Sequence, residues 1–195
     1  MAPSARREQL LGCALRTFAA KGLGDTRHTD LAQDAGVALP TVFHYYPTRD
    51  ELTEAVLAEV SRFLLDEIVA PHFDSDMPAP LAIEHILMTF CDAIDTHPYH
   101  LRVWLEWSVA LRDGLWERYL LFYSAALDGI GRLLAHGALA GTIAPDLDRE
   151  DAARVIVGLA HMIVQMRCTG STRAQVDHTV RLLVRGYLQP QPGSV

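Results

Sequence analysis

The stretch that decides the fold is TDLAQDAGVALPTVFHYY, residues 29–46. Its apolar residues recur every three or four positions, which is the spacing of short helices with one buried face. Gly36 suits the end of a helix over about residues 29–35. Pro40 suits the first turn of a second short helix that runs to Tyr46. Two short helices joined by a glycine-containing turn predict a helix-turn-helix.

The flanking residues supply the rest of a small helical unit. The helical spacing of the preceding residues predicts a helix over about 4–21, which ends at a lysine followed by Gly22. After Pro47, Thr48 and Glu51 form a capping box that starts a long helix. We therefore predict a helix-turn-helix DNA-binding domain over residues 1–50.

The remaining chain shows the same helical spacing, without an alternating strand pattern or an Asn-Gly hairpin signal. We predict an all-α fold of about nine helices. After a proline-rich loop over residues 72–80, helices are expected near 81–96, 99–112, 113–137, 148–167 and 172–188. Residues 51–195 are predicted to form a regulatory domain for ligand binding and dimerisation.

The charge distribution is compatible with a small DNA-facing surface. The net charge is −7, but residues 1–50 carry six Lys/Arg against five Asp/Glu, so the acidic excess lies in the rest of the chain. A locally positive N-terminal surface could therefore meet DNA while the acidic body is repelled by it.

Several other classes of protein are disfavoured. The sequence contains no Glu-x-x-His, no Gly-rich phosphate loop and no nucleophile elbow, so we expect neither an enzyme nor a metal or cofactor site. Cys13, Cys91 and Cys168 lie far apart among apolar residues and are expected to be buried and unpaired. The longest apolar stretch, residues 155–166, is too short to span a membrane, so a cytoplasmic protein is expected.

Residues 29–52 resemble the DNA-binding domain of the TetR family of regulators. The resemblance rests on a group of helix-turn-helix positions: Ala32, Ala35, Gly36, Val37, Thr41, Phe43, His44, Tyr45, Tyr46, Arg49, Glu51 and Leu52. Residues 103–108 (VWLEWS), Arg112-Asp113 and Trp116 are similar to the LuxR/HapR/SmcR branch of quorum-sensing master regulators. Ala38 stands where the family usually has Ser, and His44 where the branch usually has Asn, so the operator is expected to differ.

The residues that would read DNA lie on and beside the second short helix. Its N-terminal residues and exposed face are expected to meet base edges, while helix N-termini and cations meet phosphates. Thr41 and His44 could instead serve as a capping hydroxyl and a packed ring, and Val42 and Phe43 are expected to face the core. The resemblance adds phosphate contacts for Tyr45 and Arg49. The predicted DNA-binding residues are Arg6, Arg7, Arg27, His28, Thr29, Leu39, Pro40, Thr41, His44, Tyr45 and Arg49.

Two further assignments concern the larger domain. The resemblance implies a homodimer that pairs the helices near 148–167 and 172–188, with about half of their apolar residues left for the protomer's own core: Val155, Ile156, Leu159, Met162, Ile163, Met166, Val176, Val180, Leu183, Val184 and Tyr187. The apolar helix over 99–112 is expected at the centre of the domain. Around it, ordinary core packing or a pocket for a small apolar ligand is expected from Phe90, Trp104, Trp107, Trp116, Tyr119, Phe122, Tyr123 and Met162.

Taken together, these patterns favour a homodimeric transcriptional regulator that binds a pseudo-palindromic double-stranded DNA operator and responds to a small apolar ligand. The alternative is a helical ligand-binding protein without DNA binding. That alternative leaves the aromatic-rich helix over residues 40–46 without a function.

Overall fold

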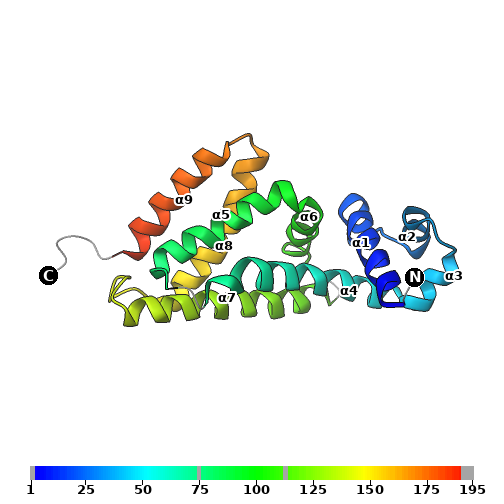
Figure 1. Ribbon diagram of the computed structural model, residues 1–195, viewed down its shortest axis with the longest axis horizontal. Coiled ribbons are helices and arrows are strands. Elements are labelled where there is room, and N and C mark those ends of the chain that lie inside the picture. Colours follow the sequence, from blue (N-terminus) through cyan, green and yellow to red (C-terminus); the bar gives the residue numbers. More distant parts are fainter. Residues whose placement is uncertain (1–2, 74–75, 112–113, 190–195) are drawn as a thin grey trace. The chain divides into compact units, whose positions relative to one another are not determined.

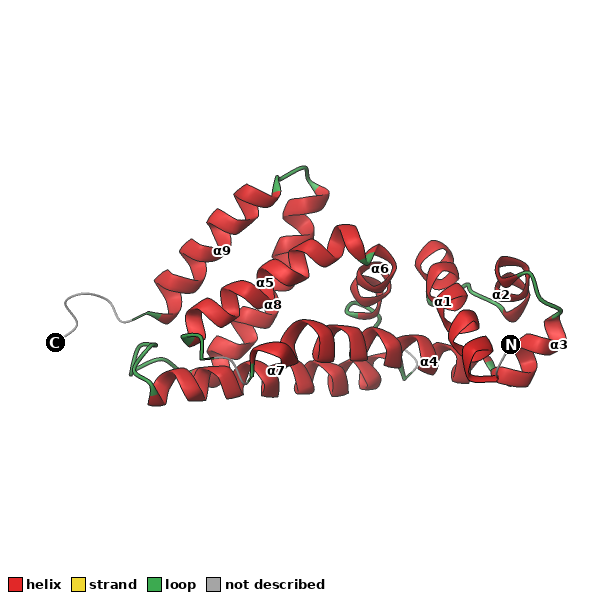
Figure 2. Cartoon of the chain, in the orientation of Figure 1, coloured by secondary structure: helices red, strands yellow, loops and turns green. Residues whose placement is uncertain are grey.

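The computed structural model, which describes residues 3–73, 76–111 and 114–189, has a helix in each region where the helical spacing predicts one (Figure 1). No strand occurs in these ranges (Figure 2). The prediction of an all-α fold is confirmed. None of the described helices is long and apolar enough to cross a membrane.

The helical elements follow one another closely along the chain. The first four are α1 (Pro3–Lys21), α2 (His28–Ala35), α3 (Leu39–Tyr45) and α4 (Arg49–Arg62). A π-helical turn (Phe63–Val69) and a 3-10 turn (Ala70–His72) continue α4. The remaining helices are α5 (Ala79–Thr96), α6 (Pro98–Trp107), α7 (Leu115–Leu139), α8 (Arg149–Cys168) and α9 (Arg173–Leu188).

Contacts divide the chain into two compact units. The first unit comprises Met1–Phe63 and His97–Tyr119, and the second comprises Leu64–Thr96 and Leu120–Val195. The predicted boundary after residue 50 divides the chain differently, because the contacts of α6 group it with the N-terminal helices.

Helix α6 differs from its prediction in place and in length. It packs on α1 and α4 in the first unit, whereas it was expected at the centre of the larger domain. The carboxylate of Glu106 accepts a hydrogen bond of 2.8 Å from the Leu23 backbone N–H, which ties α6 to the turn after α1. The helix ends at Trp107, where the Ser108 hydroxyl donates to the Leu105 carbonyl. Arg112 and Asp113 lie outside the described residues.

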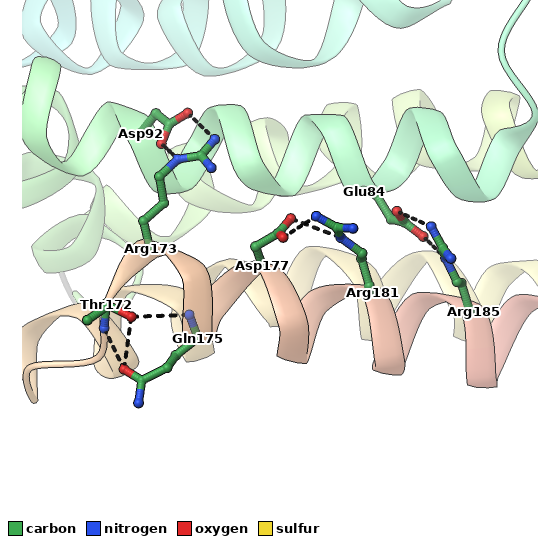
Figure 3. Close-up of polar contacts among 8 residues, drawn as sticks. All are labelled: Glu84, Asp92, Thr172, Arg173, Gln175, Asp177, Arg181 and Arg185. Atoms are coloured by element: carbon green, nitrogen blue, oxygen red, sulfur yellow. Dashed lines mark hydrogen bonds and ion pairs between the residues drawn. The ribbon is translucent and has the colours of Figure 1, made fainter.

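The second unit is organised around α5, which packs on α8 and α9 (Figure 1). Apolar side chains from these helices form its core, among them Ile83, Ile156, Ile163, Val176 and Val180. Arginines of α9 cross to carboxylates of α5 at two points, Arg173 to Asp92 and Arg185 to Glu84 (Figure 3). Both the apolar core and these ion pairs hold α9 against α5.

The cysteine prediction is correct for two of the three residues. Cys13 and Cys91 are buried, whereas Cys168 is exposed at the end of α8. Its apolar sequence neighbours predicted burial, but the last turn of a helix exposes side chains on several sides. Within the described residues, no group of histidines, cysteines and carboxylates could hold a metal ion.

Candidate nucleic-acid interface

The turn between α2 and α3 has the geometry that the sequence predicts. Gly36 adopts a left-handed conformation with φ of 63°, which a side chain would disfavour. The Val37 backbone N–H donates to the Ala32 carbonyl at 3.0 Å, which closes the end of α2. Pro40 occupies the first turn of α3, and Ala38 precedes that helix without a side-chain cap. The two helices therefore form the predicted helix-turn-helix.

Helix α3 has one buried and one exposed face. Val42 and Tyr46 are buried, and Leu39 lies partly buried on the same side. Pro40, Phe43 and His44 are exposed, while Thr41 and Tyr45 are half-buried. The exposed face is thus formed by side chains that lie outside the core of the first unit.

His28 and Phe43 occupy different environments from those predicted. His28 is 8% exposed, and its Nε2 lies 2.7 Å from the Tyr46 carbonyl oxygen. Its ring stacks on Phe43 with centroids 4.5 Å apart and planes at 11°. Phe43 is 45% exposed and does not face the core. His28, predicted as a DNA contact, is instead a packed residue, because its ring turns inward to bond the end of α3.

The Arg49 side chain forms hydrogen bonds with the backbone of the first unit. Its Nε donates to the Thr26 carbonyl at 3.1 Å, and its Nη2 donates to the carbonyls of Leu23 and Gly24. These carbonyls belong to the turn between α1 and α2. The resemblance implied a phosphate contact for Arg49, but the described bonds direct the guanidinium toward this turn, which it closes.

The other predicted cationic and polar contacts lie at helix starts. Arg6 donates to Gln9 on its own helix, and the Arg7 guanidinium lies 5.3 Å from the centroid of the Tyr46 ring. Arg27 and Thr29 are exposed at the N-terminus of α2. A helix N-terminus carries unpaired backbone N–H groups and a partial positive charge, which favour a phosphate. The phosphate contacts of Arg6, Arg7, Arg27 and Thr29 remain predictions.

The predicted ligand-binding residues fall into both units. In the first unit, Trp107 and Tyr119 are buried, with ring centroids 5.7 Å apart, and Trp116 stacks on Tyr119 at 5.4 Å. Trp104 is buried in the same unit. The second unit contains the buried rings of Phe90 and Phe122 and the half-buried Tyr123 and Met162.

The predicted dimerisation residues split into two sets. The second unit's own core buries Ile156, Ile163, Val176, Val180 and Val184. The remaining residues leave apolar surface accessible on α8 and α9: Val155, Leu159, Met162, Met166, Leu183 and Tyr187. We call this second set the α8–α9 apolar face.

The two-helix arrangement, with its capped turn and exposed α3, is that of a helix-turn-helix DNA-binding protein. The profile described as "Bacterial regulatory proteins, tetR family" matches residues 10–56, which cover the end of α1, both helices of the motif and half of α4. The chain belongs to the TetR family of transcriptional regulators.

Relatives of similar length support this membership. The transcriptional regulator LuxR of Vibrio harveyi is 29% identical over 96% of this chain and 89% of its own. The regulator BetI of Cronobacter sakazakii is 25% identical over 95% and 90%. A solved structure of a putative transcriptional regulator from Saccharomonospora viridis in complex with choline covers 96% of this chain and 100% of its own, with a TM-score of 0.82 and 17% identity. That structure supports the fold alone.

Proposed function

We propose that the protein acts as a cytoplasmic homodimer that binds a pseudo-palindromic double-stranded DNA operator through α3 of each protomer. The observation that carries this proposal is the exposed face of α3. Pro40, Thr41 and His44 combine apolar surface with a hydroxyl and an imidazole on one helix, and the major groove is wide enough to admit an α-helix. Tyr45 and the cations of α1 and α2 would contact phosphates and position this helix.

Dimerisation is supported by the α8–α9 apolar face. A single helix-turn-helix buries too little surface for a specific complex, whereas two copies related by a two-fold axis read two half-sites. Val155 is 46% exposed, Leu183 is 41% exposed and Tyr187 is 39% exposed, so both helices leave apolar area uncovered. A second copy of the same face would cover this area.

We infer a small apolar ligand as the effector. The support is the cluster of Trp107, Trp116 and Tyr119, since convergent aromatic rings are typical of apolar ligand pockets. The regulator FadR from Bacillus subtilis, which has a similar fold with a TM-score of 0.76 and 18% identity, was solved with stearoyl-CoA, a ligand whose acyl chain is apolar. By its likeness to LuxR, we further propose a regulator of the quorum-sensing type.

The test of DNA binding is a selection from random duplexes with the full-length protein, followed by titrations of the enriched sequence at several salt concentrations. We expect a palindromic sequence, two protomers per duplex and an affinity that falls steeply with salt. Failure of any duplex to be enriched at low salt would favour the helical ligand-binding alternative.

Variants of α3 distinguish a specific contact from general attraction. Thr41→Ala combined with His44→Ala should weaken binding of the selected duplex at least about tenfold, because each base contact is worth about 1–3 kcal/mol. His136→Ala, on the exposed surface of α7, serves as the control and should bind like the unmodified protein. Equal affinity of the double variant would contradict the assignment of α3 as the recognition helix.

A further inference from the structure

Phe43 is an exposed aromatic side chain on the same helical face as Pro40. The two residues are three positions apart in α3, so they are neighbours on its surface. Val42 and Tyr46 are buried whereas Phe43 is not, so Phe43 lies at the edge of the exposed face of the helix. A large apolar ring left 45% exposed within the recognition helix costs hydration free energy unless a binding partner covers it.

The ring of Phe43 is also held in place by the ring of His28, which packs against one of its faces. His28 stacks nearly parallel on it, with centroids 4.5 Å apart, and an exposed phenylalanine without such a neighbour would sample several rotamers. The His28 ring is itself fixed, because its Nε2 lies 2.7 Å from the Tyr46 carbonyl. A carbonyl only accepts hydrogen bonds, so Nε2 carries the hydrogen and donates it.

We propose that Phe43 contacts a thymine C5-methyl group in the major groove and that His28 is the positioning residue for this contact. The inference rests on the proposed function, since it assigns a base contact to the same helix. His28 is buried and does not itself reach the duplex.

Thymine is the base that suits this side chain. The other groups that base edges display in the major groove are hydrogen-bond donors and acceptors, whereas the C5-methyl of thymine is apolar. A phenyl ring forms no conventional hydrogen bond, so it gains most from covering that methyl group. Pro40 extends the apolar strip by one turn, and His44 provides the adjacent polar contact.

The test replaces thymine with deoxyuridine at one position of the selected operator at a time, in both half-sites together, which removes one methyl group from each half-site. Burial of one methyl group corresponds to about a fourfold change in affinity, so symmetric replacement in both half-sites should weaken binding by about 16-fold. Phe43→Ala should bind the thymine and uracil operators equally well. Since Phe43 is exposed, this substitution should leave the helical content unchanged, as measured by circular dichroism.

Two substitutions of His28 separate stacking from hydrogen bonding. His28→Phe keeps a ring against Phe43 and loses the N–H donor, whereas His28→Gln keeps a donor and loses the ring. If stacking positions Phe43, His28→Phe should retain more of the thymine preference than His28→Gln. If the two folded variants show the same preference for thymine over uracil, the positioning role of His28 is overturned.

The outcomes keep the two proposals distinct. If the unmodified protein binds no selected duplex, the proposed function itself fails. If it binds a duplex but no position distinguishes thymine from uracil, or if Phe43→Ala keeps the full preference, the thymine contact alone is wrong.

Discussion

At the scale of single residues, Arg49 joins the start of α4 to the turn that follows α1. Its guanidinium donates to the carbonyls of Leu23, Gly24 and Thr26, while the Leu23 N–H donates to Glu106 of α6. This turn leads directly into α2, whose N-terminus is a predicted phosphate contact. The side chain therefore positions the helix-turn-helix as well as contributing charge.

We expect Arg49→Ala to lower both stability and DNA affinity. Loss of its hydrogen bonds to the turn should reduce the free energy of unfolding by about 1–2 kcal/mol, measured by denaturant titration. Arg49→Lys should recover little of this loss, because lysine lacks the planar fork of donors. Arg6→Ala is the matched control, since Arg6 bonds only within α1 among its described hydrogen bonds and its loss should weaken DNA binding without changing stability. Full recovery by lysine would instead indicate a simple charge effect.

Gly137 lies at a position where neighbouring residues come too close to leave room for a side chain. A Cβ at this position would lie 2.5 Å from the Cβ of Ala79 and 3.1 Å from the hydroxyl of Thr142. Gly137→Ala should therefore destabilise the protein by about 1–3 kcal/mol.

Gly131 on the same helix provides the control for that substitution. A Cβ there meets no atom within 4 Å, so Gly131→Ala should be neutral or stabilising by up to about 1 kcal/mol. Thermal unfolding of the two variants tests the prediction, and a similar melting temperature for both would contradict the close approach of α7 to α5.

At the scale of elements, ion pairs complement the apolar contact between α5 and α9. Figure 3 shows Arg173 against Asp92 and Arg185 against Glu84, whereas Arg181 pairs with Asp177 on α9 itself. Glu84 is 5% exposed, so its pair with Arg185 lies at the edge of the core. The two inter-helix pairs select the register of α9 on α5, because a shift along the axis would separate both.

The Arg173 pair should make stability depend on pH in a defined range. Hydrogen bonds from Arg173 lower the pKa of Asp92. A carboxyl with a lowered pKa in the folded state stabilises the protein above its unfolded pKa of about 4, and this contribution is lost as the pH falls through the folded pKa.

The measurement compares the unfolding free energy of the unmodified protein with that of Arg173→Ala. At neutral pH the difference should be about 0.2–1 kcal/mol, since both side chains are partly exposed, and it should shrink as the pH falls below about 4. Arg181→Ala tests the same kind of pair within one helix. A difference for Arg173→Ala that does not change with pH would show that the ion pair with Asp92 does not carry it.

At the scale of the whole molecule, formation of the proposed dimer can be tested separately from folding of the protomer. Leu183→Arg places a charge on the α8–α9 apolar face, where it should convert the dimer to a monomer while the helical content stays unchanged. Leu139→Arg is the control, because Leu139 is 90% exposed at the end of α7. Light scattering after gel filtration measures the mass of each variant. A dimer that persists in Leu183→Arg would place the interface elsewhere.

Local signals determined most of the helix boundaries. Glycine at the end of α2, proline in the first turn of α3 and the Thr48 cap of α4 act through the chain next to them, so each is visible in sequence. The π-helical turn after α4 and the early end of α6 were not predicted, because apolar residues continue through both stretches of the sequence.

By itself, the sequence determined the all-α fold, the helix-turn-helix and the membership of the TetR family, since periodicity, caps and motif residues are local properties. Only the tertiary structure decided which side of each helix is buried against a distant neighbour. His28 turns inward to the end of α3, Phe43 stacks on it and stays exposed, and Arg49 reaches back across 23 residues to the Thr26 carbonyl. These placements depend on how three helices pack, because the spacing of residues along one helix does not specify the surface of the next.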